Sequence, residues 1–172
     1  CSPASHSSSK AIIGANDLKK VDQMDSRLGI LMASDRECNA FSISEDQVMT
    51  ALHCVGEDPM SFVGFEYKTA EISLRVIDIQ LLDDRKDVVV YKLDGNLPTF
   101  YEIGALDLQK KALLISHDST QNAQVSTVCN AAYALGGAAA FAHECDTLEK
   151  YSGAPILQED KVIGLHIGAN KD

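Results

Sequence analysis

Short apolar or alternating runs recur along this chain, and turn-forming residues separate them. Eight such runs, four to eight residues long, are Leu28–Met32, Val48–Leu52, Ile72–Ile79, Asp87–Leu93, Ala112–Ile115, Val125–Val128, Ala154–Leu157 and Lys161–Ile167. Runs of this length and β-branched content are typical of strands. Ile72–Ile79 alternates almost perfectly between apolar and polar residues, as a half-exposed strand does. The pattern predicts an all-β sandwich or barrel.

The clearest internal boundary is Leu93–Pro98, which combines Asp-Gly with a proline. It predicts two parts of similar size, 11–95 and 96–172, each able to form one small barrel, after a polar segment at 1–10. The Ala- and Gly-rich segment 131–142 is compatible with a short helix or with a tight bend.

Four of the five cysteines are explained by two local disulfides, Cys38–Cys54 and Cys129–Cys145. Such bonds indicate an oxidising compartment, and each would close a loop worth about 3 kcal/mol of stability. The competing interpretation is a zinc site formed by His53, Cys54, His143 and Cys145. Adjacent residues cannot easily aim both side chains at one metal, and no C-x-x-C spacing is present. We therefore expect no metal.

The fifth cysteine, Cys1, is followed by the polar stretch Ser2–Ser9, and this arrangement resembles the start of a mature bacterial lipoprotein. The segment would then be a flexible tether that attaches the chain to a membrane through Cys1. A processing end with an unpaired thiol is the alternative. A net charge of −10 disfavours nucleic acid and anionic lipid surfaces as partners, and no apolar run is long enough to span a bilayer.

His53 lies in a setting that suits a general base. It follows Val48–Ala51, which has the pattern of a buried strand, and it is adjacent to Cys54. A disulfide from Cys54 to Cys38 would fix the turn that carries the imidazole, and general-base catalysis requires such fixed placement.

An aspartate and a serine later in the chain are candidate partners for His53. Asp87 directly precedes an apolar run, so we favour it over the neighbouring Asp84 as the carboxylate that accepts the Nδ1 proton of His53. Ser152 begins a Ser-Gly-x-Pro sequence before another apolar run, which by itself fits a nucleophile loop and a plain turn before a strand equally well.

These segments resemble the motifs of trypsin-like serine peptidases, and the order His, Asp, Ser is that of the chymotrypsin-like double barrel. The Cys-Asp-Thr before the serine and the Ile-Gly-x-His after it are most similar to the bacterial glutamyl endopeptidase branch. The resemblance covers about Ile12 to Gly168. Its blocks are Ala11–Asp17, Cys38–Cys54, Asp87–Leu93, Cys145–Pro155 and Val162–Gly168.

The resemblance implies two packed antiparallel β-barrels of the six-stranded type, with His53 and Asp87 in the first and Ser152 in the second. It implies an extracytoplasmic serine endopeptidase that acts on peptides or proteins without a cofactor, and we expect a monomer. Ser152 would attack the scissile carbonyl while His53 takes its proton. Backbone N–H groups of Lys150 and Ser152 would stabilise the oxyanion, by about 3–4 kcal/mol for one donor.

Three departures from the family pattern bear on activity. Lys150 replaces the family's glycine, so either the loop is adjusted or the oxyanion hole forms only with substrate. Tyr151 replaces the aspartate with which trypsins bind a new N-terminus, so activation by N-terminal insertion is not expected. The sequence also stops at Asn170–Asp172, soon after His166. These departures favour an alternative, a catalytically impaired binding or scaffold module, whereas the complete set of three reactive side chains opposes it.

The residues expected to bind the substrate side chain give conflicting indications. Asp146 occupies the place where trypsins hold the aspartate that binds Arg or Lys. Thr147 and His166 match positions with which glutamyl endopeptidases bind an acidic side chain. The Cys-Asp-Thr context leads us to expect a slight preference for Glu.

Overall fold

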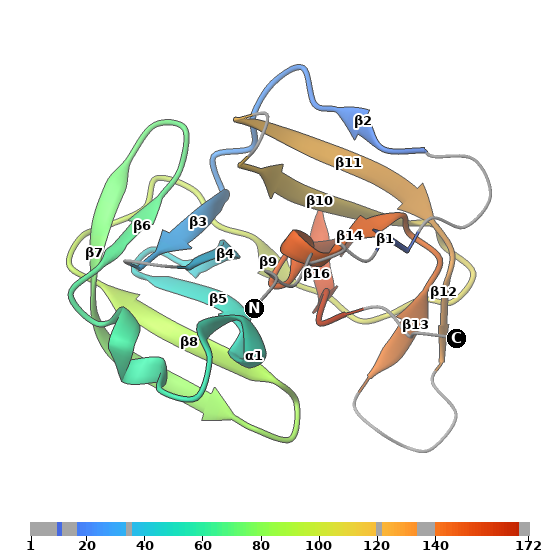
Figure 1. Cartoon of the computed structure of the whole chain (residues 1–172). Coiled ribbons are helices and arrows are strands. Elements are labelled where there is room, and N and C mark those ends of the chain that lie inside the picture. Colours follow the sequence, from blue (N-terminus) through green and yellow to red (C-terminus); the bar gives the residue numbers. More distant parts are fainter. Residues whose placement is uncertain (1–9, 12–16, 34–35, 120–121, 134–139, 169–172) are drawn as a thin grey trace, which may run out of the picture.

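The structure is a computed structural model, and it describes residues 10–11, 17–33, 36–119, 122–133 and 140–168. Residues 1–9 of the predicted tether, Cys1 among them, lie outside the described residues, whereas Lys10 belongs to a strand. The regular secondary structure of the described chain consists mostly of strands, in agreement with the expected all-β class (Figure 1).

The first half forms a closed barrel of six strands in the order β3-β4-β5-β8-β7-β6. Its strands are β3 (Leu28–Met32), β4 (Glu37–Ser44), β5 (Gln47–Ala51), β6 (Glu66–Lys68), β7 (Ser73–Asp83) and β8 (Val88–Leu93). Inward-facing side chains such as Leu31, Val48 and Tyr91 are fully buried. The barrel therefore has a packed core, as expected for one this small.

The second half is a six-stranded sheet in the order β2-β11-β10-β15-β16-β9. Its strands are β2 (Lys19–Lys20), β9 (Glu102–Ile103), β10 (Ala112–Asp118), β11 (Ala123–Cys129), β15 (Pro155–Gln158) and β16 (Lys161–Leu165). Two smaller pairs flank it. They are β1 (Lys10–Ala11) with β14 (Thr147–Leu148), and β12 (Ala131–Tyr133) with β13 (Phe141–His143).

The segment 131–142 does not form a helix at either end. Its ends form the antiparallel strands β12 and β13, with Ala132 paired to Ala142. Helix propensity of alanine is a weak signal that tertiary pairing overrides. The residues between the two strands lie outside the described part of the chain.

The N-terminal strands pair with the second half, although the first barrel follows them in the sequence. β1 pairs with β14, and β2 pairs with β11. The division at 95/96 stays a prediction; the strands of the closed barrel lie within residues 28–93.

A shared apolar cluster joins the two halves. Phe41 of β4 packs in one core with Ile115 of β10, Leu157 of β15 and Tyr101. Phe41 and Tyr101 meet edge to face, with ring centroids 6.1 Å apart. Burial of these apolar side chains stabilises the contact between the two halves. Any site between the halves depends on that contact.

Short helical turns are few in the described chain: α1 (Leu52–Val55), η1 (Pro59–Phe62) and η2 (Glu149–Tyr151). None of the described helices is long and apolar enough to cross a membrane.

Candidate active site

His53 is held on a single helical turn where β5 ends. Helix α1 begins at Leu52, and the Leu52 N–H donates to the Asp87 carbonyl at 3.0 Å. The expected Cys38–Cys54 disulfide is present and ties α1 to β4. Local hydrogen bonding and a covalent link therefore fix the backbone on both sides of the imidazole.

Asp87 lies immediately before β8 and opposite the end of β5, where Ala51 pairs with Val88. Its backbone has φ +55°, a left-handed conformation that Asp tolerates better than most residues. The turn places its carboxylate toward α1: Oδ1 accepts from the backbone N–H of His53 at 2.7 Å, and Oδ2 lies 2.5 Å from His53 Nδ1.

Ser152 follows η2 and precedes β15. The next residue, Gly153, has φ +85° and donates its N–H to the His166 carbonyl at 2.8 Å. A sharp turn of this kind leaves the Ser152 side chain partly exposed between the two halves.

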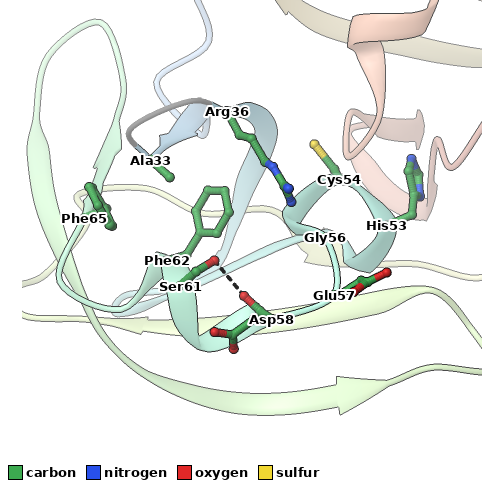
Figure 2. Close-up of a pocket in the computed structure, with 10 residues that line it drawn as sticks. All are labelled: Ala33, Arg36, His53, Cys54, Gly56, Glu57, Asp58, Ser61, Phe62 and Phe65. Atoms are coloured by element: carbon green, nitrogen blue, oxygen red, sulfur yellow. Dashed lines mark hydrogen bonds between the residues drawn. The ribbon is translucent and has the colours of Figure 1, made fainter.

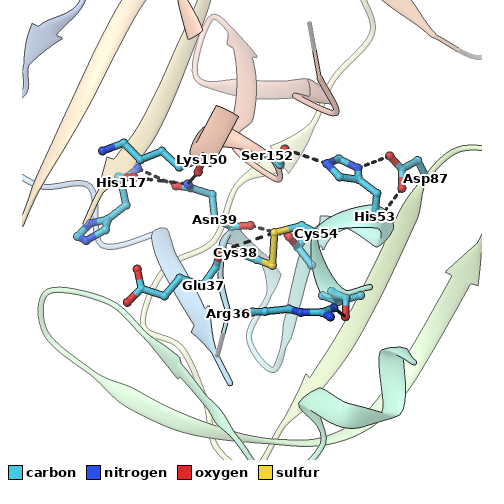
Figure 3. The surroundings of a disulfide bond; sticks show 12 residues. Arg36, Glu37, Cys38, Asn39, His53, Cys54, Asp87, His117, Lys150 and Ser152 are labelled. Carbon is cyan, nitrogen blue, oxygen red and sulfur yellow. Dashed lines mark hydrogen bonds and ion pairs between the residues drawn. A yellow bond between two sulfur atoms is a disulfide. The ribbon is translucent and has the colours of Figure 1, made fainter. Parts of the chain in front are cut away.

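Asp87, His53 and Ser152 form one continuous chain of hydrogen bonds (Figure 3). Ser152 Oγ lies 2.8 Å from His53 Nε2, and the imidazole remains 43 % exposed. With Nδ1–H donating to the carboxylate, Nε2 is the acceptor for the serine hydroxyl proton. The arrangement can therefore remove a proton from Ser152 as its oxygen attacks an acyl group.

The serine loop accommodates both of its departures from the family pattern, Lys150 and Tyr151. Lys150 lies within η2, and φ there is not positive, so no glycine-only conformation is needed. Its ammonium pairs with the buried carboxylate of Asp118, on β10. Burial raises the pKa of Tyr151 to about 12, with a smaller contribution from the Asp118 charge. Tyr151 is therefore a neutral core residue where trypsins carry a charge.

The three expected substrate-binding residues are all buried, and the structure gives them different surroundings. Asp146 Oδ2 accepts from the backbone N–H of Asp17 at 2.7 Å. Thr147 lies on β14 and pairs with β1. His166 Nδ1 lies 3.0 Å from His143 Nε2. Burial lowers the pKa of His166 to about 3, with help from His143 and His53, so this imidazole is neutral.

The second expected disulfide, Cys129–Cys145, is also present. His143 lies close to its sulfur atoms. With Cys54 and Cys145 both oxidised, the alternative zinc site loses its two thiolate ligands.

A pocket of about 640 Å³ adjoins His53 on the side of the first barrel (Figure 2). Its lining residues are Ala33, Arg36, His53, Cys54, Gly56, Glu57, Asp58, Ser61, Phe62 and Phe65. Apolar and charged side chains thus meet beside the imidazole, in a pocket whose volume lies within the range of ordinary ligand sites.

Sequence reasoning missed two groups that hold the serine loop. One is Asp118, the partner of Lys150. The other is Asn39 of β4, whose Nδ2 donates to the Lys150 carbonyl at 3.0 Å (Figure 3). Asp118 lies in no motif, and Asn39 lies within the Cys38–Cys54 block without a feature that singles it out, because both act on the serine loop from strands distant in sequence.

Neither a protein-family profile nor a curated protein matches the chain. Solved structures match its fold. A Glu endopeptidase is 14% identical over 93% of this chain and 88% of its own, with a TM-score of 0.71. The Rv3671c protease of M. tuberculosis, in an inactive form, is 16% identical over 85% of this chain and 79% of its own, with a TM-score of 0.69.

A scabies mite inactivated protease paralogue is also similar, at 14% identity over 84% of this chain and 81% of its own, with a TM-score of 0.60. A Glu endopeptidase and an inactivated protease paralogue thus share this architecture, and at such identity the likeness establishes the fold rather than the activity. Together with the closed barrel and the second sheet, it shows that the chain has the double-barrel fold of the chymotrypsin-like serine proteases.

Proposed function

We propose that this protein is an extracytoplasmic serine endopeptidase that cleaves peptide bonds through an acyl-enzyme. The observation that carries the proposal is the hydrogen-bonded chain from Asp87 through His53 to Ser152. Two disulfides support a location outside the cytoplasm, because such bonds persist in oxidising compartments.

The mechanism follows from these contacts. His53 Nε2 accepts the Ser152 hydroxyl proton as Oγ attacks the scissile carbonyl, and the same proton then passes to the leaving amine. Asp87 holds the tautomer through Nδ1 and stabilises the imidazolium that forms. Water hydrolyses the acyl-enzyme by the reverse sequence of proton transfers. The backbone N–H groups of Lys150 and Ser152 are our candidates for the oxyanion donors.

For the residue before the cut, we propose a preference for an acidic side chain. The Asp146 carboxylate already binds the backbone of Asp17, which argues against a role in binding Arg or Lys. Neutral His166 offers hydrogen bonding rather than positive charge, and Thr147 is held on β14 beside β1. Profiling of cleavage sites on a peptide library tests this preference, and cleavage after Arg or Lys would refute it.

A fluorophosphonate probe tests the enzyme proposal directly. We expect covalent labelling of Ser152 in the wild-type protein and none in Ser152→Ala or His53→Ala. The matched control is Ser73→Ala, which removes an exposed serine on β7 that does not line the pocket beside His53 and should leave labelling intact. Absence of wild-type labelling, with the fold intact by circular dichroism, would contradict the proposal.

A non-catalytic peptide-binding module is the second candidate. The observation that favours it is Lys150 within the tight turn η2, at the place of an oxyanion donor. Binding of library peptides with equal affinity by wild type and Ser152→Ala, without any product, would support the module.

A further inference from the structure

Asn39 is a buried asparagine, 2 % exposed, on the face of β4 that meets the second half. Its Nδ2 donates to the Lys150 carbonyl at 3.0 Å and approaches the His117 carbonyl at 3.4 Å, while its Oδ1 accepts from the His117 N–H at 2.7 Å. One carboxamide therefore joins the first barrel, β10 and the turn before Ser152 (Figure 3).

The main chain of Asn39 contacts the same loop on the other side of Ser152. A Cβ atom placed on Gly153 would lie 2.1 Å from the Asn39 carbonyl oxygen and 2.4 Å from Thr50 Oγ1. Thr50 Oγ1 itself donates to that oxygen at 2.6 Å. Residues two before and one after Ser152 are thus both fixed against a single residue of β4.

The same short segment of β4 also determines where His53 lies. Cys38 precedes Asn39 and is bonded to Cys54, the residue after His53. Because a peptide plane is rigid, the hydrogen bond to the Lys150 carbonyl also fixes the direction of the Tyr151 N–H. Cys38 and Asn39 therefore connect the base and the nucleophile loop through two adjacent residues.

We propose that Asn39 is a positioning residue that holds Ser152 in hydrogen-bonding register with His53. The inference rests on the proposed function for its catalytic consequence. Because Asn39 is buried, a carboxamide group that loses its partner stays largely desolvated, which costs free energy. An aspartate at this position keeps the volume and the acceptor for His117, but it turns an oxygen toward the Lys150 carbonyl.

Asn39→Asp is the decisive variant, with two readouts. We expect kcat to fall about 10- to 100-fold, the cost of a small misplacement of a reacting group, while KM changes by less than about threefold. Amide hydrogen exchange should quicken in residues 149–154 and not in residues 161–165 of β16. The matched control, Asn96→Asp at an exposed turn, should change neither readout.

The outcomes separate the inference from the function that it serves. If the wild-type protein neither cleaves nor labels, the proposed function fails, and faster exchange confined to 149–154 still shows that Asn39 holds the loop. If the wild type is active and Asn39→Asp keeps its kcat, or exchange quickens throughout the protein, the positioning role is wrong. Should Asn39→Asp not fold, Asn39→Ser removes the carboxamide without adding charge and carries the same expectations.

Discussion

Asp87 meets His53 through two hydrogen bonds, one to the ring and one to the backbone N–H. The carboxylate therefore sets both the tautomer of the imidazole and the position of the turn that carries it. Its positive φ shows that the tight turn before β8 is what directs it to α1.

At Asp87, replacement by Asn should lower kcat by about 10⁴-fold, because an amide stabilises the wrong tautomer and cannot compensate the imidazolium charge. Steady-state hydrolysis of a peptide ester measures the change. Asp84→Asn, an exposed neighbour, is the control and should retain activity. Equal losses in both variants would mean that the local charge, and not the contact to His53, matters.

At Gly153, an added methyl group has no room. Gly153→Ala should lower the free energy of unfolding by about 2 kcal/mol or more, from backbone strain together with overpacking. Gly64 also has a positive φ, but nothing lies within 4 Å of its Cβ position, so Gly64→Ala reports the strain alone. Urea denaturation of both variants separates the two effects. Equal losses would show that the Asn39 contact is not tight.

At the scale of elements, the strand runs were predictable because burial imposes a simple pattern on them. Leu28–Met32 became β3 without change. Strict alternation from Leu74 and Val76 would turn Asp78 inward, but Asp78 is exposed and Ile79 is half-buried. The phase changes because register shifts at Val76/Asp78 and Ile79/Leu81 interrupt the pairing of β7 with β8. Bulges depend on the partner strand, which local sequence does not specify.

The residues of the site also divide into those that local sequence could predict and those that it could not. His53, Asp87 and Ser152 could be named because each occupies a short motif with a chemical reason. Asn39 and Asp118 could not, since their function arises only when β4 and β10 pack beside η2. Long-range contacts of single polar residues carry no periodic signal.

The two disulfides provide a comparison between elements, because both have a sequence separation of 16. Chain entropy predicts an equal loss of about 3 kcal/mol for Cys38→Ala/Cys54→Ala and for Cys129→Ala/Cys145→Ala. Only the first bond anchors α1, so only the first double variant should also lower kcat when assayed well below its melting temperature. An equal fall in kcat for both would argue that general loosening is responsible.

At the scale of the whole molecule, the pair formed by buried His166 and partly buried His143 links stability to pH. Burial lowers the pKa of His166 to about 3, with His143 and His53 contributing, and burial also lowers the pKa of His143. An unfolded imidazole titrates near 6.5, so the unfolded chain binds more protons than the native one below that pH. Stability is therefore greatest above about pH 6.5 and declines as the pH falls toward 3.

Urea denaturation at several values between pH 7 and pH 5 should show this decline, and His166→Asn should make the dependence shallower. An unchanged slope in the variant would mean that other groups dominate the proton uptake on unfolding.

The pairing of β2 with β11, and of β1 with β14, has a consequence for how the molecule responds to damage. A protease that nicks the exposed link near Pro98 would not liberate two separate pieces. The leading fragment would still carry strands embedded in the trailing one, and the shared apolar cluster would hold them together. In size-exclusion chromatography the clipped protein should elute as one particle until denaturant is added. The Ser152 hydroxyl and the His53 imidazole should still face each other in it.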